Sequence, residues 1–278
     1  MARMTRVALI GALMISASAC QREAAAPANA AGNAEVASAE PFNGTWKADL
    51  ASVKIDEQPS VYLLKDGTYT CSTCTPPLTL AADGAFHAIP DRPYYDSASK
   101  TVVDANTIKA AYRKGDKVIS DSTTTVSADG KTLTTNWHQT PVGQPEVKGT
   151  TVETRVGPAP AGAHAVSGSW KTAKFEGISD EALTVTFNVE GDSLSMQSPT
   201  GQSYKAKFGG PEVAIAGDTG GTMVKVERLA ANSFRETNSR GGKVVNVTTT
   251  TIGADGKMSV VSEDKEQAST MQYEAIKQ

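Results

Sequence analysis

The 278-residue sequence contains a long internal duplication, because residues 105–131 recur without a gap as residues 231–257. The two copies also open alike, with Gly44-Thr45-Trp46 in the first and Gly168-Ser169-Trp170 in the second. The offset between the copies far exceeds the ~20 to 50 residue period of solenoids and propellers. The sequence therefore indicates two copies of one domain, and the fold has to be derived for each copy.

A low-complexity segment separates the two copies. Residues 157–165 are rich in Pro, Ala and Gly, a composition that is typical of a linker. We therefore expect one domain at residues 41–156 and a second at residues 166–278. Each has the usual size of a single domain and is long enough to bury most of the surface that its unfolded chain exposes.

Both copies have the pattern of β-strands. At residues 183–190 apolar and polar residues alternate, which places one side of the strand inside and the other outside. Runs of β-branched residues end at Asp129-Gly130 and Asp255-Gly256, which are typical hairpin turns. Turn residues recur every ~8 to 15 residues, as in barrels and sandwiches. The predicted fold class is all-β, with two tandem antiparallel meander β-barrels.

The opening of each copy resembles the first strand of the calycins, the lipocalins and intracellular fatty-acid-binding proteins, which begin with Gly-x-Trp. The resemblance implies barrels closed at one end by Trp46 and Trp170, with a lumen that holds a small apolar ligand. Lipocalins stack a late Arg on this Trp; Arg155 is the candidate in copy one, and copy two has no clear equivalent. The Arg-x-Tyr of fatty-acid-binding proteins is missing from the end of copy two. The residues expected to line the lumen include Leu63, Val185 and Phe187.

Residues 1–19 have the layout of a secretion signal. Arg3 and Arg6 precede an apolar run at residues 7–15, and small residues follow. The apolar run is too short to cross a bilayer core, which takes about 20 residues. The sequence therefore predicts export of the chain and removal of this segment.

The stretch Ala17-Ser18-Ala19-Cys20 resembles the lipobox of bacterial lipoproteins, with Ala in the first place where Leu is commoner. The resemblance implies acylation of Cys20, stable anchoring through several acyl chains, and sorting to the outer membrane on its periplasmic face, because Gln21 is not Asp. Residues 20–40 lack aromatic side chains, so we expect a flexible tether. The alternative is an ordinary signal peptide cleaved after Ala19.

The pair Cys71 and Cys74 stands out for its chemistry. With Cys20 acylated, two cysteines remain in an oxidising compartment, so we expect a disulfide between them. A redox site normally begins a helix, whereas the flanks here are strand and turn. A metal site needs two further ligands, and the three His residues show no paired spacing. A redox site, a metal site and unpaired thiols remain open, and Ser195 and Ser198 at the corresponding places indicate that the fold does not require the pair.

Tyr94 and Tyr95 lie in a Pro-bounded loop of copy one, and the corresponding segment of copy two is Gly217–Gly221. Exposed aromatic residues often anchor interfaces, so a ligand or partner contact is one interpretation. The other is that one ring packs down on the barrel end while the second lies along the surface. The sequence favours the second interpretation.

Catalytic groups do not assemble in the sequence. Gly-x-Ser-x-Gly, His-Glu-x-x-His and Gly-rich phosphate-binding patterns are missing, so we expect no catalytic residues, no metal, no cofactor and no enzyme activity. Carboxylates such as Glu153, Glu227 and Glu236 are scattered over predicted strands, and we expect them on a solvated outer face. The net charge of −3, from 27 basic and 30 acidic residues, argues against a nucleic-acid partner.

Three functional interpretations follow. The first is a membrane-anchored module that binds a small apolar envelope molecule in a barrel lumen. The second is an envelope protein–protein interaction module with filled barrels, and the third is a redox protein that uses Cys71 and Cys74. The resemblance of both openings to ligand-carrying families slightly favours the first.

Overall fold

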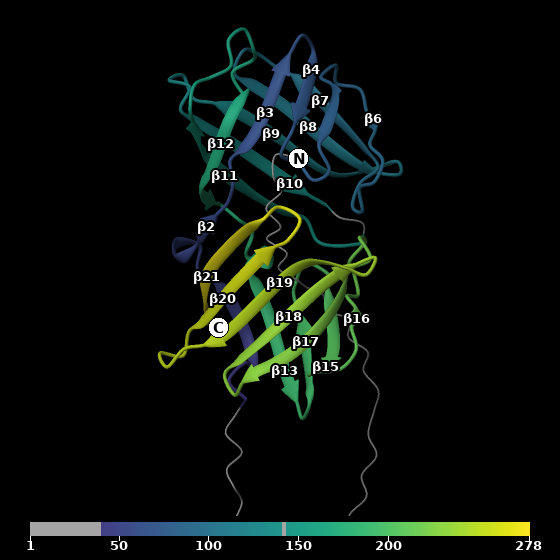
Figure 1. Cartoon of the computed structure of the whole chain (residues 1–278), viewed down its shortest axis with the longest axis vertical. Coiled ribbons are helices and arrows are strands. Elements are labelled where there is room, and N and C mark those ends of the chain that lie inside the picture. The colour runs from purple at the N-terminus through teal and green to yellow at the C-terminus, as the bar shows by residue number, and fades with distance from the viewer. Residues whose placement is uncertain (1–39, 141–142) are drawn as a thin grey trace, which may run out of the picture.

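The computed structural model describes residues 40–140 and 143–278. Within these ranges, helical structure is limited to two 3-10 turns, η1 (Leu50–Ser52) and η2 (Asp180–Ala182). The strands form two near-closed antiparallel sheets (Figure 1), so the predicted fold class of two antiparallel barrels is confirmed. The predicted signal peptide, Cys20 and the tether up to residue 39 lie outside the described residues.

Barrel 1 is a ten-stranded sheet in the order β5-β4-β3-β12-β11-β10-β9-β8-β7-β6. An isolated bridge between Asp83 and Thr101 connects the segment after β5 to β7 and brings the two ends of the sheet together. Its strands are β3 (Ser60–Lys65), β4 (Thr68–Cys71), β5 (Leu78–Ala81), β6 (His87–Ala88), β7 (Ser97–Val102), β8 (Thr107–Lys114), β9 (Lys117–Val126), β10 (Thr132–Gln139), β11 (Val147–Val156) and β12 (Gly168–Glu176).

Barrel 2 has the order β15-β14-β13-β1-β21-β20-β19-β18-β17-β16, and the short β2 (Lys54–Asp56) also pairs with β21. Isolated bridges between Ser203 and Ala216 and between Phe208 and Val226 bring its two ends together. Its other strands are β1 (Gly44–Ala48), β13 (Thr184–Glu190), β14 (Ser193–Gln197), β15 (Ser203–Lys207), β16 (Val213–Ala214), β17 (Met223–Ala230), β18 (Ser233–Arg240), β19 (Lys243–Ile252), β20 (Met258–Asp264) and β21 (Ser269–Lys277).

The two repeats exchange their opening strands. Strand β1 of the first repeat lies between β13 and β21 of the second, where Trp46 faces Val185 and Lys277. Strand β12 of the second repeat lies between β3 and β11 of the first, where Trp170 faces Ser60 and Arg155. The expected domains at 41–156 and 166–278 are therefore correct as repeats but not as barrels, because each barrel takes its opening strand from the other repeat.

The segments that connect the barrels differ from the one expected. The Pro- and Ala-rich residues 157–165 join β11 to β12, which are neighbours within barrel 1. The chain crosses between barrels at residues 49–59, after β1, and again at residues 177–183, after β12. Two crossings hold the barrels together, so the expected linker is a hairpin connection of barrel 1 and not a hinge between domains.

The barrels lie end to end along the long axis of the molecule (Figure 1). The loop of Tyr94 reaches barrel 2, where its hydroxyl donates to Asp218 Oδ1 at 3.1 Å and accepts from Arg240 Nη2 at 2.9 Å. The Thr75 hydroxyl donates to the carbonyl of Glu266 at 3.2 Å. A buried apolar cluster fills the junction and comprises Ala48, Val147, Phe175, Ile178, Ala182 and Leu183. We call the half of each barrel next to this junction its near half, and the other its far half.

The far halves are tightly packed. In barrel 2 the Phe234 ring lies edge-on to Phe42, with ring centres 4.8 Å apart, and to Phe187 at 5.3 Å. Glu40, the first described residue, pairs with Arg228 at this end. Large side chains with less than 2 % exposure in both barrels include Trp46, Trp170, Phe42, Phe234, Leu133, Leu194 and Met258. Burial of this apolar surface is the main stabilising contribution to each barrel.

Candidate functional site

Trp46 and Trp170 close the far ends of the two lumens, each in the barrel of the other repeat. The indole Nε1 of Trp46 donates to the carbonyl of Phe42 at 2.8 Å, and that of Trp170 to the carbonyl of Val166 at 2.9 Å. Both rings are buried, at 1 % and 0 % exposure. The two Trp residues, expected from the sequence to close a barrel, are each buried in a barrel core, and the two barrels are exchanged between the repeats.

A cation lies over each Trp. The Arg155 guanidinium is 4.0 Å from the centre of the Trp170 ring, and Lys277 Nζ is 5.6 Å from the centre of the Trp46 ring. Lys277 is thus the counterpart of Arg155, since it pairs with Trp46 as Arg155 pairs with Trp170; the sequence did not reveal it because it is a Lys. The Gly of each Gly-x-Trp makes room for this cation: a Cβ on Gly168 would collide with the Arg155 guanidinium.

The predicted lumen residues divide into two groups. Val185 and Phe187 are buried in the barrel 2 core, at 7 % and 5 % exposure. Leu63 is 41 % exposed and points outward, so that prediction was wrong; its neighbour Leu64 is 3 % exposed and points inward. Two adjacent Leu residues give no alternation, so the sequence alone did not fix which one faces the lumen.

The near half of the barrel 1 lumen is filled by its own side chains. Trp137 lies over Gly149, where a Cβ would come within 2.5 Å of its ring, and its Nε1 donates to Thr151 Oγ1 at 3.2 Å. Deeper in the barrel, Lys100 is 3 % exposed and its Nζ donates to the Tyr112 hydroxyl at 3.2 Å. Barrel 1 therefore leaves little space for a ligand on its axis.

Barrel 2 differs at the matching positions. By the repeat offset, Thr248 corresponds to Ser122. Trp137 pairs with Ser122 and Ser262 pairs with Thr248, so Ser262 takes the place of Trp137. Met271 takes the place of Gly149 on the neighbouring strand. Four polar side chains lie on the same inward face as the buried Phe234, Thr250 and Val260. Each of the four is only partly buried: Asn238, Asn246, Thr248 and Ser262. The near half of this barrel is thus lined by more polar side chains than that of barrel 1, and it lacks the indole of Trp137.

Hydrogen bonds connect these polar side chains. Asn246 Nδ2 donates to Ser262 Oγ at 2.9 Å, and Thr248 Oγ1 donates to Asn246 Oδ1 at 2.9 Å. Asn238 Oδ1 is buried and accepts no hydrogen bond from any described residue. An acceptor without a partner costs free energy, which a bound donor removes.

Glu236 forms the floor of this half-lumen. It is 7 % exposed, and the hydroxyl of Tyr204 donates to its Oε1 at 2.6 Å. Burial raises the pKa of Glu236 to about 7, with the Tyr204 hydrogen bond acting against that rise. Within residues 40–140 and 143–278, its second oxygen and the hydroxyl of Tyr273 have no hydrogen-bond partner. The expectation that Glu236 lies on a solvated outer face was therefore wrong, as it was for Glu153, which is 3 % exposed; Glu227 does lie outside.

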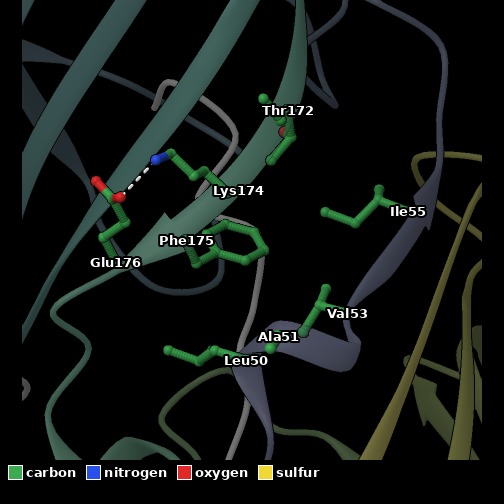
Figure 2. A pocket seen from close by; sticks show the side chains of 9 residues that line it. Leu50, Ala51, Val53, Ile55, Thr172, Lys174, Phe175 and Glu176 are labelled. Atoms are coloured by element: carbon green, nitrogen blue, oxygen red, sulfur yellow. Dashed lines mark ion pairs between the residues drawn. The ribbon is translucent and has the colours of Figure 1, made fainter.

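A concavity lies at the junction, between the η1–β2 segment and β12 (Figure 2). Its volume is about 510 Å³. Leu50, Val53, Ile55 and Phe175 give it an apolar wall, and Lys174 pairs with Glu176 at its edge, Nζ to Oε1 2.6 Å. This pocket is a product of the strand exchange, because both segments flank an exchanged strand.

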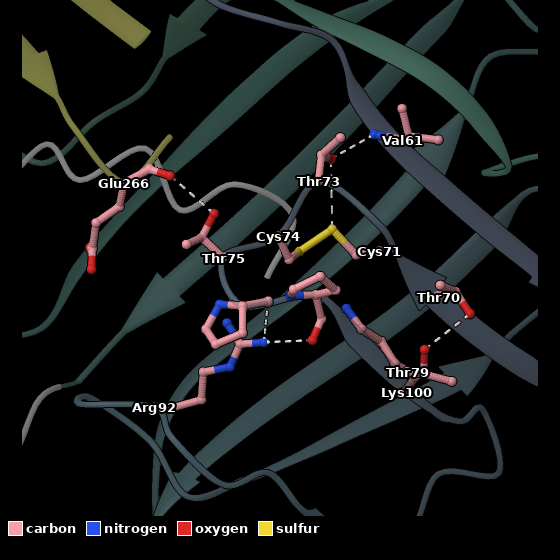
Figure 3. The surroundings of a disulfide bond; sticks show 12 residues. Val61, Thr70, Cys71, Thr73, Cys74, Thr75, Thr79, Arg92, Lys100 and Glu266 are labelled. Carbon is pink, nitrogen blue, oxygen red and sulfur yellow. Dashed lines mark hydrogen bonds between the residues drawn. A yellow bond between two sulfur atoms is a disulfide. The ribbon is translucent and has the colours of Figure 1, made fainter. Parts of the chain in front are cut away.

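Cys71 and Cys74 form a disulfide, as expected (Figure 3). Cys71 pairs with Tyr62 as Met196 pairs with Phe187, so the structural counterpart of Cys71 is the buried Met196 and not Ser195. The sulfur of Cys71, 1 % exposed, thus fills the core where the other barrel has a Met. Around the loop, Thr73 Oγ1 accepts from the Val61 amide at 2.9 Å, and Arg92 donates to the carbonyls of Pro76 and Pro77.

The two loop tyrosines have different roles. Tyr95 is 4 % exposed and packs edge-on against Tyr112 in the barrel 1 core, with ring centres 5.0 Å apart. Tyr94 lies at the junction and contacts barrel 2 through Arg240 and Asp218. The sequence favoured one ring packed down on the barrel end, and the Tyr95 ring is packed in this way. Tyr94, in contrast, contacts the second barrel of its own chain.

Among the described residues, three or more His, Cys, Asp or Glu side chains nowhere come together as a metal site would require. In the same part of the chain, no helix is long and apolar enough to cross a membrane. The fold defines a strand-exchanged double β-barrel, and polar side chains line the near half of barrel 2. Comparison of the chain with protein-family models, curated proteins and solved structures gives no match, so its function has to be argued from this geometry.

Proposed function

We propose that this chain is a non-enzymatic binding protein of the bacterial cell envelope, anchored in the outer membrane through acylated Cys20 and facing the periplasm. Its ligand is a small molecule with an apolar body and a polar end, held in the near half of the barrel 2 lumen. The observation that carries the proposal is the replacement of the Trp137 plug of barrel 1 by Ser262 in barrel 2. Apolar walls with a few directed polar groups are typical of small-molecule sites.

Neighbouring side chains suit such a ligand. Met271 and Tyr273 are partly buried and pack against the junction cluster, so they offer apolar surface beside the polar belt. Glu236, Asn238 and Tyr273 each have a polar atom without a partner among the described residues. A ligand that meets these atoms gains hydrogen bonds in a site shielded from water, where they are strongest.

Native mass spectrometry of the full chain, purified from its own envelope, tests the proposal. We expect an adduct mass that is lost on denaturation. The matched control is the double variant Ser262→Trp, Met271→Gly, which gives barrel 2 the plug of barrel 1; its mass should show no adduct. A second control, Ile55→Glu, places a charge in the junction pocket, and loss of the adduct there instead would move the site to that pocket.

One observation favours a second candidate function, an envelope interaction module. Barrel 1 is filled by Trp137 and by the core around Lys100, as expected for a barrel that serves as a scaffold. In that case the full chain carries no adduct but retains a protein partner after mild cross-linking in the envelope. The redox interpretation of Cys71 and Cys74 stays a prediction, tested by a two-proton mass gain under mild reductant.

A further inference from the structure

One matching pair of cross-strand positions carries a base in barrel 1 and an acid in barrel 2. In barrel 1, Lys100 on β7 pairs across the sheet with Ala110 on β8. In barrel 2, Val226 on β17 pairs with Glu236 on β18, at the positions that correspond by the gapless repeat. A long charged side chain faces a small or apolar one in each pair, but the cation of barrel 1 is replaced by an acid in barrel 2.

Barrel 1 supplies an amine on an alkyl chain from its own sequence. Lys100 Nζ lies 4.6 Å from the centre of the Tyr69 ring and 5.5 Å from that of Tyr112, and it also donates to the Tyr112 hydroxyl. Tyrosine rings attract cations through their negative faces, and the attraction is larger where water is excluded. This lumen therefore shows how the fold accommodates an amine on a short alkyl chain.

Barrel 2 has a buried carboxylate, Glu236, in place of an amine. The described residues place no Lys, Arg or His in a salt bridge with Glu236, whose hydrogen-bond partner is the Tyr204 hydroxyl. The Tyr273 hydroxyl and Asn238 Oδ1 lie on the same inward face with no partner among those residues. Burying a carboxylate without a cation is costly, and a bound cation offsets that cost.

We infer that the near half of the barrel 2 lumen binds a small primary alkylammonium ion. Its ammonium group pairs with Glu236 and donates to Asn238 Oδ1, and its alkyl chain packs against Met271. The inference rests on the proposed function and specifies the chemical class of its ligand. It places the ligand where barrel 1 has the Trp137 plug and barrel 2 has Ser262.

Isothermal titration of the full chain with butylammonium chloride and with 1-butanol, at mildly alkaline pH, tests the inference. The two probes share an alkyl chain and differ in charge. We expect butylammonium to bind and to lose at least about tenfold in affinity in Glu236→Gln, because hydrogen bonds to charged groups contribute about 1.5 to 3 kcal/mol. Glu227→Gln is the matched control, since Glu227 is exposed and pairs with Lys225; its affinity should not change.

A second variant, which gives barrel 2 the plug of barrel 1, keeps the inference testable even if Glu236→Gln fails to fold. Ser262→Trp with Met271→Gly should abolish butylammonium binding while unfolding cooperatively, as the parent does. Equal binding of butanol and butylammonium, unchanged by Glu236→Gln, overturns the ammonium inference and leaves the proposed function standing. A chain that binds neither probe and carries no native adduct overturns both.

Discussion

The phenol ring of Tyr94 lies against Gly220, where an added Cβ would come within 2.5 Å of the ring carbon Cζ. The same offset that relates residue 105 to residue 231 relates Tyr94 to Gly220, so equivalent positions of the two repeats meet at the junction. A Tyr on both sides would collide and a Gly on both sides would leave a gap. The duplication has thus diverged at this point to give two complementary surfaces.

The first prediction concerns this contact. Gly220→Ala should destabilise the protein by about 1 to 3 kcal/mol, because the ring of Tyr94 has to move. Urea unfolding measures the loss. In a Tyr94→Ala background the same substitution should cost much less, and an equal cost in both backgrounds would show that the two residues do not interact.

The second prediction concerns the cation over Trp170. Arg155 donates to the carbonyls of Gly130, Ser167 and Ala165 at 2.6, 2.7 and 2.7 Å. Arg155→Met should cost about 2 kcal/mol or more, since the stacked cation is lost and these carbonyls lose their donor. Thermal unfolding gives the comparison. Lys131→Met, in the neighbouring turn, is the control and should change stability little; equal effects would assign Arg155 no special role.

The third prediction is an unusual dependence of stability on pH. Burial lowers the pKa of Lys100 from 10.5 to about 7, and burial raises the pKa of Glu236 from 4.5 to about 7. Between pH 4.5 and about 7 the folded state retains the proton on Glu236 that the unfolded state has lost, so stability falls as pH rises. Between about 7 and 10.5 the unfolded state retains the proton on Lys100, so stability rises with pH.

Urea unfolding over that pH range separates the two contributions. The neighbouring Tyr69, Tyr112 and Tyr204 stay neutral throughout, because burial raises the pKa of each hydroxyl. Lys100→Met should remove the rise above neutral pH, and Glu236→Gln should remove the fall below it. A parent profile without a minimum near neutral pH would contradict the assignment.

The fourth prediction concerns the disulfide. Replacing both Cys71 and Cys74 by Ser should destabilise the chain by at least about 2 kcal/mol, since the loop constraint is lost and a hydroxyl replaces the buried sulfur of Cys71. Small-molecule binding by barrel 2 should persist, because the loop belongs to barrel 1. If the function in the cell is lost while folding and binding are retained, the redox interpretation gains support over a structural one.

The fifth prediction tests the strand exchange itself. Residues 158–162 are exposed, and a protease site introduced there cuts between β11 and β12. The two fragments should stay together in size-exclusion chromatography, since each contributes a strand to both barrels, and should separate in denaturant. Two independent barrels would separate after the cut under native conditions.

Strand alternation predicted much of this fold. The alternating residues 183–190 form a strand with Val185 and Phe187 inside, and the Asp-Gly pairs form turns between strands. The strand exchange was not predictable, because the two opening strands have nearly the same sequence and either one satisfies either barrel.

The site was less predictable than the fold. Glu236 lies two residues after Phe234, so strand alternation alone places its side chain inside the barrel. A carboxylate on a strand is usually solvated, and Glu236 was therefore expected on the outer face. Lys100 was missed for the same reason. The signal that could have revealed both is the comparison of repeats: the cross-strand pairs Lys100–Ala110 and Val226–Glu236 differ in charge where the rest of the segment is similar.

The exchange of β1 sets the order in which the chain completes its fold. Strand β1 is the first to be synthesised, yet its neighbours are β13 and β21, and β21 ends at Lys277. Strand β1 can pair with β13 once residues 184–190 are present, but its second edge stays unpaired until β21 is complete. The earliest strand is thus completed by the latest, and a chain truncated near its C-terminus leaves an unpaired edge on β1, where another chain can pair.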